Sequence, residues 1–135
     1  MYQPKYTFTS GGIKVGQNSS APSDSKSVSK MYSTPYEAFF LNEQKEVLYF
    51  HVLYALMDQN LGAFEANFVT NIFNMFIYIE NHWEVLCEDI ATGRINENFL
   101  VSQESQELAA KIKRKANPEC ANFLRNEFKK GFQGI

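Results

Sequence analysis

The chain has 135 residues, which is the size of one domain or of one piece of a larger domain. Hydrophobic residues make up 44% of it and aromatic residues 15%, so the composition supports a packed core and excludes a wholly disordered chain. The net charge of −2 gives no basis for non-specific binding to nucleic acid or for attachment to an anionic membrane surface.

The sequence also favours a reducing compartment, and we predict a cytoplasmic location. Cys87 and Cys120 are the two cysteines, and they form no CxxC pair. The first residues lack the charged and then apolar pattern of a secretory signal. No apolar run approaches the ~20 residues that a membrane span needs.

Residues 1–33 are predicted to form an extended segment with a glycine turn and a serine-rich loop. Apolar residues alternate with polar ones on either side of Gly11 and Gly12, which is typical of extended chain around a turn. Serine then dominates residues 17–33, a composition that predicts a flexible loop or linker.

Residues 34–135 are predicted to be mainly helical. Asn42 is a suitable N-cap for a helix that continues to about residue 60, and Glu46 lies near its start, where the helix dipole favours an acid. Residues 47–57 are apolar on almost every side, which is typical of a helix buried in something larger than a small bundle.

A long amphipathic helix is the clearest element of the sequence. Length and aromatic content favour a short strand over residues 63–67 before it. The helix itself is predicted over residues 70–92, and Gly93 is suited to end it. Its apolar residues recur at alternating spacings of four and three, which places six of them on one stripe: Ile72, Phe76, Ile79, Trp83, Leu86 and Ile90.

Two shorter helices follow. Residues 103–116 are rich in strong helix formers. The triplet Asn117-Pro118-Glu119 predicts the start of the last helix, because Asn caps it, Pro fits its first turn and Glu complements its dipole. The sequence therefore predicts an α+β fold, a fragment of an α/β domain, that is mostly helical, with about four helices and one or two short strands.

No complete catalytic constellation is visible in the sequence. Gly11 and Gly16 have the spacing of a phosphate-binding P-loop, but Gln17 stands where the lysine is needed. The two histidines lack the spacing of a metal site. We interpret His51 as a satisfied core residue and His82 as a surface residue.

The cysteines and the acidic residues predict no site either. Cys87 is interpreted as an inert buried thiol. Cys120 lies in the first turn of a helix, where a thiol pKa can fall, but no histidine partners it. Glu84, Glu88 and Asp89 are placed on the solvated face of the long helix, where nothing drives their pKa values apart.

The order of the motifs resembles the middle of the N-terminal domain of the GH3 family, the ATP-dependent acyl-acid amido synthetases, which are relatives of luciferase-type adenylating enzymes. The glycine turn "SGGIKVG" is followed by a Tyr-x-His pattern that ends at His51. The pattern E-x-x-W-E-x-L-x-x-D-I-x-x-G then runs from Glu80 to Gly93, before an "NPE" helix. The resemblance covers residues 6–135, and the ending "EFKKGFQGI" resembles the fungal and protist branch more than the plant hormone-conjugating branch.

This resemblance implies a fragment of an enzyme that activates a small carboxylic acid with ATP and joins it to an amino acid. ATP and magnesium are implied for the full-length family. Neither is expected to bind this chain alone, because the nucleotide motifs of the family do not occur in it. The remainder of the enzyme is the implied partner, and it would supply neighbours for the apolar helix over residues 47–57.

The resemblance also implies where an acyl pocket lies. In the family, small residues after the glycine turn and a residue of the strand before the long helix contribute to this pocket. Asn18, Ser19 and Asn67 occupy those positions and imply a more polar acid than the plant hormones. No catalytic residue is carried over.

Two alternatives are compatible with the sequence. A non-catalytic helical interaction or binding module would use surplus apolar surface as an interface. An unrelated orphan α-helical domain would have residues 63–67 in a helix rather than a strand.

Overall fold

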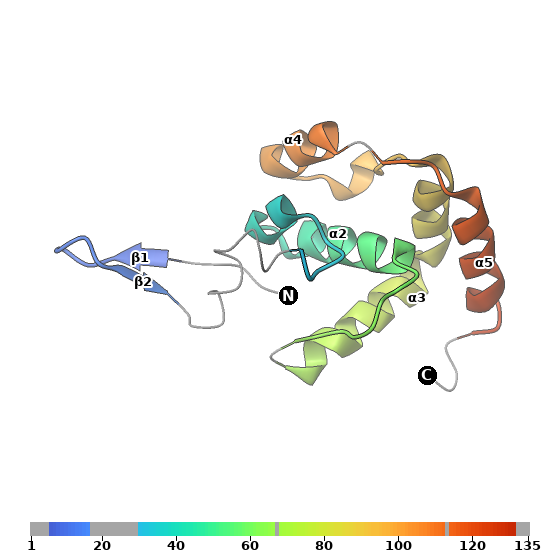
Figure 1. The fold of residues 1–135 in the computed structure, drawn as a ribbon, viewed down its shortest axis with the longest axis horizontal. Coiled ribbons are helices and arrows are strands. Elements are labelled where there is room, and N and C mark those ends of the chain that lie inside the picture. Colours follow the sequence, from blue (N-terminus) through green and yellow to red (C-terminus); the bar gives the residue numbers. More distant parts are fainter. Residues whose placement is uncertain (1–5, 17–29, 67, 113, 132–135) are drawn as a thin grey trace.

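A computed structural model describes residues 6–16, 30–66, 68–112 and 114–131. Figure 1 shows a β-hairpin to one side of a helical body. The described residues form four α-helices and a two-stranded sheet, which confirms the predicted mostly helical α+β fold. The elements in chain order are β1 (Tyr6–Phe8), β2 (Lys14–Gly16), the 3-10 helix η2 (Tyr36–Phe40), α2 (Gln44–Met57), α3 (Val69–Thr92), the 3-10 helix η3 (Glu97–Phe99), α4 (Gln103–Lys111) and α5 (Pro118–Phe128).

The glycine turn joins β1 and β2 in an antiparallel hairpin. Gly12 has a φ of 80°, in the left-handed region that glycine adopts without steric cost. Its N–H donates to the carbonyl of Thr9 at 2.9 Å, and the Thr9 hydroxyl accepts from the N–H of Ile13 at 3.0 Å. Gly16 ends β2, so the segment between Gly11 and Gly16 is a hairpin rather than the strand–loop–helix of a P-loop.

Helix α2 lies at the centre of the helical body, with η2, α3 and η3 against it (Figure 1). Tyr49, Phe50 and Leu53 are fully buried. The N-cap position belongs to Glu43 rather than to the predicted Asn42. Residues 47–57 were expected to find their neighbours in the remainder of the enzyme. The structure shows instead that η2, α3 and η3 of the same chain cover the buried face of this helix.

Helix α3 confirms the predicted long helix to within one residue. Its stripe is buried from the middle of the helix onward, at Ile79, Leu86 and Ile90. Gly93 ends the helix with a φ of 71°, and a Cβ added there would lie 2.8 Å from the backbone nitrogen of Ala116. Glycine is therefore needed at this position both for its conformation and for the close approach of another segment.

The predicted strand over residues 63–67 is wrong for the part that the structure describes. Residues 61–66 form neither a strand nor a helix. A strand needs a neighbour for its backbone hydrogen bonds, and among the described residues β1 and β2 pair only with each other. Phe64 instead packs edge-on against Phe76 of α3, with ring centroids 6.0 Å apart. The helical alternative for this segment is not observed either.

The last two helices differ in how closely they follow the prediction. Helix α4 ends at Lys111 rather than near residue 116, because the segment that follows passes over Gly93 and the N–H of Asn117 donates to the carbonyl of Ile90 at 2.9 Å. Helix α5 begins at Pro118 as predicted. The side chain of Asn117 caps it by accepting from the N–H of Cys120 at 3.1 Å.

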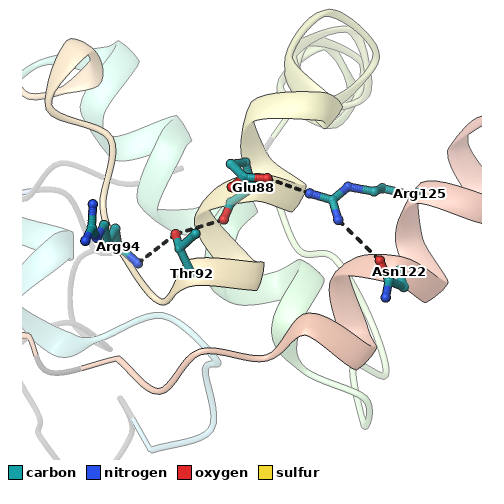
Figure 2. A network of polar contacts seen from close by, with 5 residues as sticks. All are labelled: Glu88, Thr92, Arg94, Asn122 and Arg125. Carbon is teal, nitrogen blue, oxygen red and sulfur yellow. Dashed lines mark hydrogen bonds and ion pairs between the residues drawn. The ribbon is translucent and has the colours of Figure 1, made fainter.

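A polar network ties the exposed sides of α3 and α5, which lie side by side (Figure 2). Arg125 donates to the carboxylate of Glu88 at 2.7 Å and to the side-chain oxygen of Asn122 at 3.3 Å. The hydroxyl of Thr92 donates to the carbonyl of Glu88 at 2.9 Å and accepts from the N–H of Arg94 at 3.4 Å. A partly exposed ion pair of this kind stabilises by about 1 kcal/mol at most, so apolar contacts dominate the α3–α5 packing.

Candidate functional site

The three residues predicted to line an acyl pocket, Asn18, Ser19 and Asn67, lie outside the described residues. The described chain next to them consists of Gly16, which ends β2, and Phe68, which precedes α3. Their role as pocket residues therefore stays a prediction.

A shallow, open pocket of about 210 Å³ lies at the C-terminal end of α2, lined by Ser33, Tyr54, Met57 and Asp58. The Ser33 hydroxyl donates to one carboxylate oxygen of Asp58 at 2.5 Å, and the N–H of Asn60 donates to the other at 2.9 Å. These two hydrogen bonds hold the pKa of Asp58 below its usual value. The pocket therefore carries a carboxylate at neutral pH.

Arg114 lies against two of the residues that line this pocket. Its Nη2 is 2.9 Å from the sulfur of Met57, and its guanidinium carbon is 5.8 Å from the centroid of the Tyr54 ring. Its Nη1 donates to the carbonyl of Arg94 at 2.9 Å, while its Nε is buried without a partner among the described residues. Burial lowers the pKa of Arg114, but a guanidinium stays charged at neutral pH. No sequence pattern predicted this position.

Asp89 is buried, so its interpretation as a solvated acid is wrong. Its carboxylate accepts from the Tyr49 hydroxyl at 2.7 Å, and the same hydroxyl accepts from the N–H of Asn96 at 2.9 Å. Burial raises the pKa of Asp89, and burial together with the hydrogen bond to Asp89 raises the pKa of Tyr49. The pair joins α2, α3 and the segment after α3 inside the core.

Glu46 is a second buried acid, and it joins α2 to the start of α4. Its carboxylate accepts from the N–H groups of Val101 and Ser102 at 2.6 and 2.5 Å, and from the hydroxyls of Ser102 and Ser105 at 2.6 and 2.7 Å. Ser102 is also the N-cap of α4. Burial alone would raise the pKa of Glu46, but these hydrogen bonds together hold it below its usual value.

The two histidines are both parts of the packed body. The Nδ1 atom of His51 is 2.8 Å from the Thr34 hydroxyl, and its Nε2 atom is buried without a partner among the described residues. Burial lowers the pKa of His51 to about 4, so the ring is neutral at physiological pH. His82 is only partly exposed, because its ring contacts those of Tyr78 and Phe99.

Both cysteines are buried, as interpreted for Cys87. Burial raises the pKa of Cys87 to about 11 and also raises that of Cys120, despite the position of Cys120 in the first turn of α5. Neither thiol is therefore ionised enough at neutral pH to act as a nucleophile.

The described part of the chain does not gather a metal centre, since no three His, Cys, Asp or Glu side chains within it come together. In the same part of the chain, no helix combines the length and the apolar composition that crossing a membrane requires.

The chain belongs to the GH3 family, because the family model of the GH3 N-terminal domain matches residues 1–135. The fold is similar to that of a solved structure named GH3.15 acyl acid amido synthetase, with a TM-score of 0.71 over 95% of this chain at 22% sequence identity. The sequence is also similar to the indole-3-acetic acid-amido synthetase GH3.5 of Arabidopsis thaliana. The two are 29% identical over 106 residues, and the alignment covers 77% of this chain. The chain spans 17% of that relative and 23% of the solved chain.

Proposed function

We propose that this chain acts as part of an acyl-acid amido synthetase, in which it contributes one wall of the acyl pocket. The observation that carries the proposal is the match of the GH3 N-terminal domain to the whole sequence. The Arabidopsis relative is an indole-3-acetic acid-amido synthetase by name. On this proposal, the whole enzyme conjugates a small carboxylic acid to an amino acid, and this chain is inactive alone.

ATP and magnesium enter this proposal only at the level of the family. The sequence shows none of the family's nucleotide motifs, and its glycine turn forms a hairpin. We therefore assign activation of the acid to other parts of the enzyme.

The acyl pocket is proposed at Asn18, Ser19 and Asn67, where amide and hydroxyl groups would favour an acid with polar substituents. We further propose a cytoplasmic enzyme of the fungal and protist branch, based on two cysteines that form no disulfide and on the "GFQGI" ending. The division between residues 1–33 and 34–135 separates the first proposed pocket segment from the helical part. A free-standing interaction module is not favoured, because the similarity to an amido synthetase covers 95% of the chain.

The first test measures catalysis by the isolated chain. The chain is mixed with ATP, magnesium, a panel of amino acids and a panel of acyl acids, and the release of pyrophosphate is followed. We expect no release above the buffer control, because no nucleotide site is proposed here. Robust turnover would contradict the proposal that the chain is incomplete.

The second test measures binding at the proposed pocket residues. Amide resonances are followed by NMR while acyl acids with and without polar substituents are titrated into the chain. We expect shifts at Asn18, Ser19 and Asn67 that are larger for the polar acids. Shifts confined to the open pocket at Asp58 would place the acid elsewhere and contradict the assignment.

A further inference from the structure

The C-terminal end of α2 carries a negative charge that the helix itself does not balance. Its C-cap residue is Asp58, and the last turn contains no basic residue. The C-terminus of a helix is also the negative end of the helix dipole, which favours a cation nearby. Within the described part of the chain, the ion pairs join other carboxylates, those of Glu88, Glu107 and Glu127. A cation from outside is therefore stabilised at the end of α2.

The shallow pocket of about 210 Å³ lies at this end of the helix and includes Asp58 and Ser33 in its lining. The Ser33 hydroxyl lies 2.5 Å from the Asp58 carboxylate and donates to it, so the lone pairs of the hydroxyl oxygen remain able to accept. The carboxylate accepts two hydrogen bonds, from Ser33 and from the N–H of Asn60, and has lone pairs for more. One charged and one neutral acceptor thus lie together in the pocket.

The other lining residues, Tyr54 and Met57, supply an aromatic ring and a thioether. Such side chains form an apolar wall against which a carbon chain can pack. Arg114 does not line the pocket, although it contacts both of these residues. Its Nη1 and Nη2 atoms donate to the Arg94 carbonyl and to the Met57 sulfur, so this guanidinium is held by groups other than Asp58.

We propose that the pocket at the end of α2 binds a small primary alkylammonium ion. The ammonium group donates to the carboxylate of Asp58 and to the hydroxyl oxygen of Ser33, and the carbon chain lies on Tyr54 and Met57. The pocket is smaller than the roughly 300 Å³ at which ordinary ligand pockets begin, so the ligand has few heavy atoms. The inference goes beyond the proposed function, because these residues are not those of the proposed acyl pocket.

Two other kinds of ligand fit the pocket less well. Calcium takes about six to eight oxygen ligands, whereas this pocket has one carboxylate and an apolar wall. An organic acid would bring a second negative charge beside Asp58, which disfavours it. The combination of one carboxylate with an apolar wall therefore selects an organic cation.

The first experiment compares three ligands with the same carbon chain by NMR: butylammonium, butanol and butyrate. We expect butylammonium to shift the amide resonances of Ser33, Asp58 and Asn60 in a saturable way, and to bind at least fivefold more tightly than butanol. Butyrate should leave these resonances in place. The comparison needs no variant. Absence of a saturable shift with butylammonium, or equal binding of butylammonium and butanol, would overturn the inference.

The second experiment removes the charge of Asp58. Asp58→Asn keeps the size of the side chain and should weaken butylammonium binding at least fivefold. Glu43→Gln is the matched control, because it removes an exposed carboxylate at the opposite end of the same helix, and it should bind like the wild type. Thermal melting checks that both variants fold. Wild-type binding by Asp58→Asn, or an equal loss in Glu43→Gln, would show that the Asp58 carboxylate is not the binding group.

Calcium chloride and glycine test the class of ligand. We expect calcium to displace butylammonium weakly, and glycine to bind less tightly because its carboxylate is repelled by Asp58. Stronger binding of calcium would make the pocket a metal site, and stronger binding of glycine would assign it to amino acids; either result overturns the inference. Failure of the acyl pocket at Asn18, Ser19 and Asn67 leaves these results unchanged, so the two proposals fail separately.

Discussion

The two halves of α3 share a helical apolar periodicity but have opposite surroundings. Both carry apolar residues at helical spacing, but Leu86 and Ile90 in the second half are fully buried while Phe73 in the first half is exposed. The second half lies against α5 and α2, and the first half extends beyond α5 (Figure 1). Apolar periodicity therefore identifies the side of a helix that needs a packing partner. It does not tell whether another segment of this chain provides that partner.

Shortening one apolar side chain in each half of α3 should give the largest difference in the free energy of unfolding. Leu86→Ala removes a fully buried side chain and should lower the free energy of unfolding by about 3 kcal/mol, through lost apolar burial and a cavity. Phe73→Ala removes an exposed one and should change it by about 0.5 kcal/mol or less. Urea denaturation measures both. Losses of equal size would mean that the first half is also packed.

A substitution at the end of α3 tests how tightly the packed half is closed. Gly93→Ala should lower the free energy of unfolding by about 2 kcal/mol, because the residue is left-handed and its Cβ would lie 2.8 Å from the Ala116 nitrogen. Gly62→Ala is the matched control, since an added Cβ there meets nothing within 4 Å. A control that loses as much as Gly93→Ala would show that the loss is not specific to the contact.

The hydrogen bonds that Glu46 accepts from Val101, Ser102 and Ser105 lie in the packed body. Their contribution to the free energy of unfolding can be tested by changing the pH. The folded state lowers the pKa of Glu46, so its stabilising contribution is present above the unfolded pKa and is lost as pH falls through the folded one. Glu46→Gln should cost about 1–2 kcal/mol at neutral pH, because an amide accepts fewer hydrogen bonds. Denaturation at several pH values should show a smaller loss on acidification than in the wild type. An unchanged acid dependence would contradict the assignment.

Asp89 should give a smaller effect than Glu46, and one of the opposite sign. Its folded pKa is raised, so the wild type loses stability as pH rises from the unfolded pKa through the folded one. Asp89→Asn keeps an oxygen that can accept from Tyr49 and removes the buried charge, so stability at neutral pH should change by about 1 kcal/mol or less, in the stabilising direction. The same denaturation series measures it. A large destabilisation would show that the carboxylate itself is required.

Local features were predictable because they depend on neighbours in the sequence. The extent of α3, the cap at Asn117, the end at Gly93 and the glycine turn all follow from backbone preferences within a few residues. The strand over residues 63–67 was not predictable in this way. A strand forms only with a partner, and the described chain offers none at that place.

The sequence by itself determined the helical pattern and the membership in a family, since periodicity, caps and motif order are properties of the chain alone. Only the tertiary structure decided which acids are buried. Glu46 and Asp89 look like surface residues in the sequence, and they are kept inside by hydrogen bonds from residues about 40 to 60 positions away. The tertiary structure also decided which apolar stripe is covered, because burial depends on where distant segments pack, and this information is not contained in the spacing of side chains.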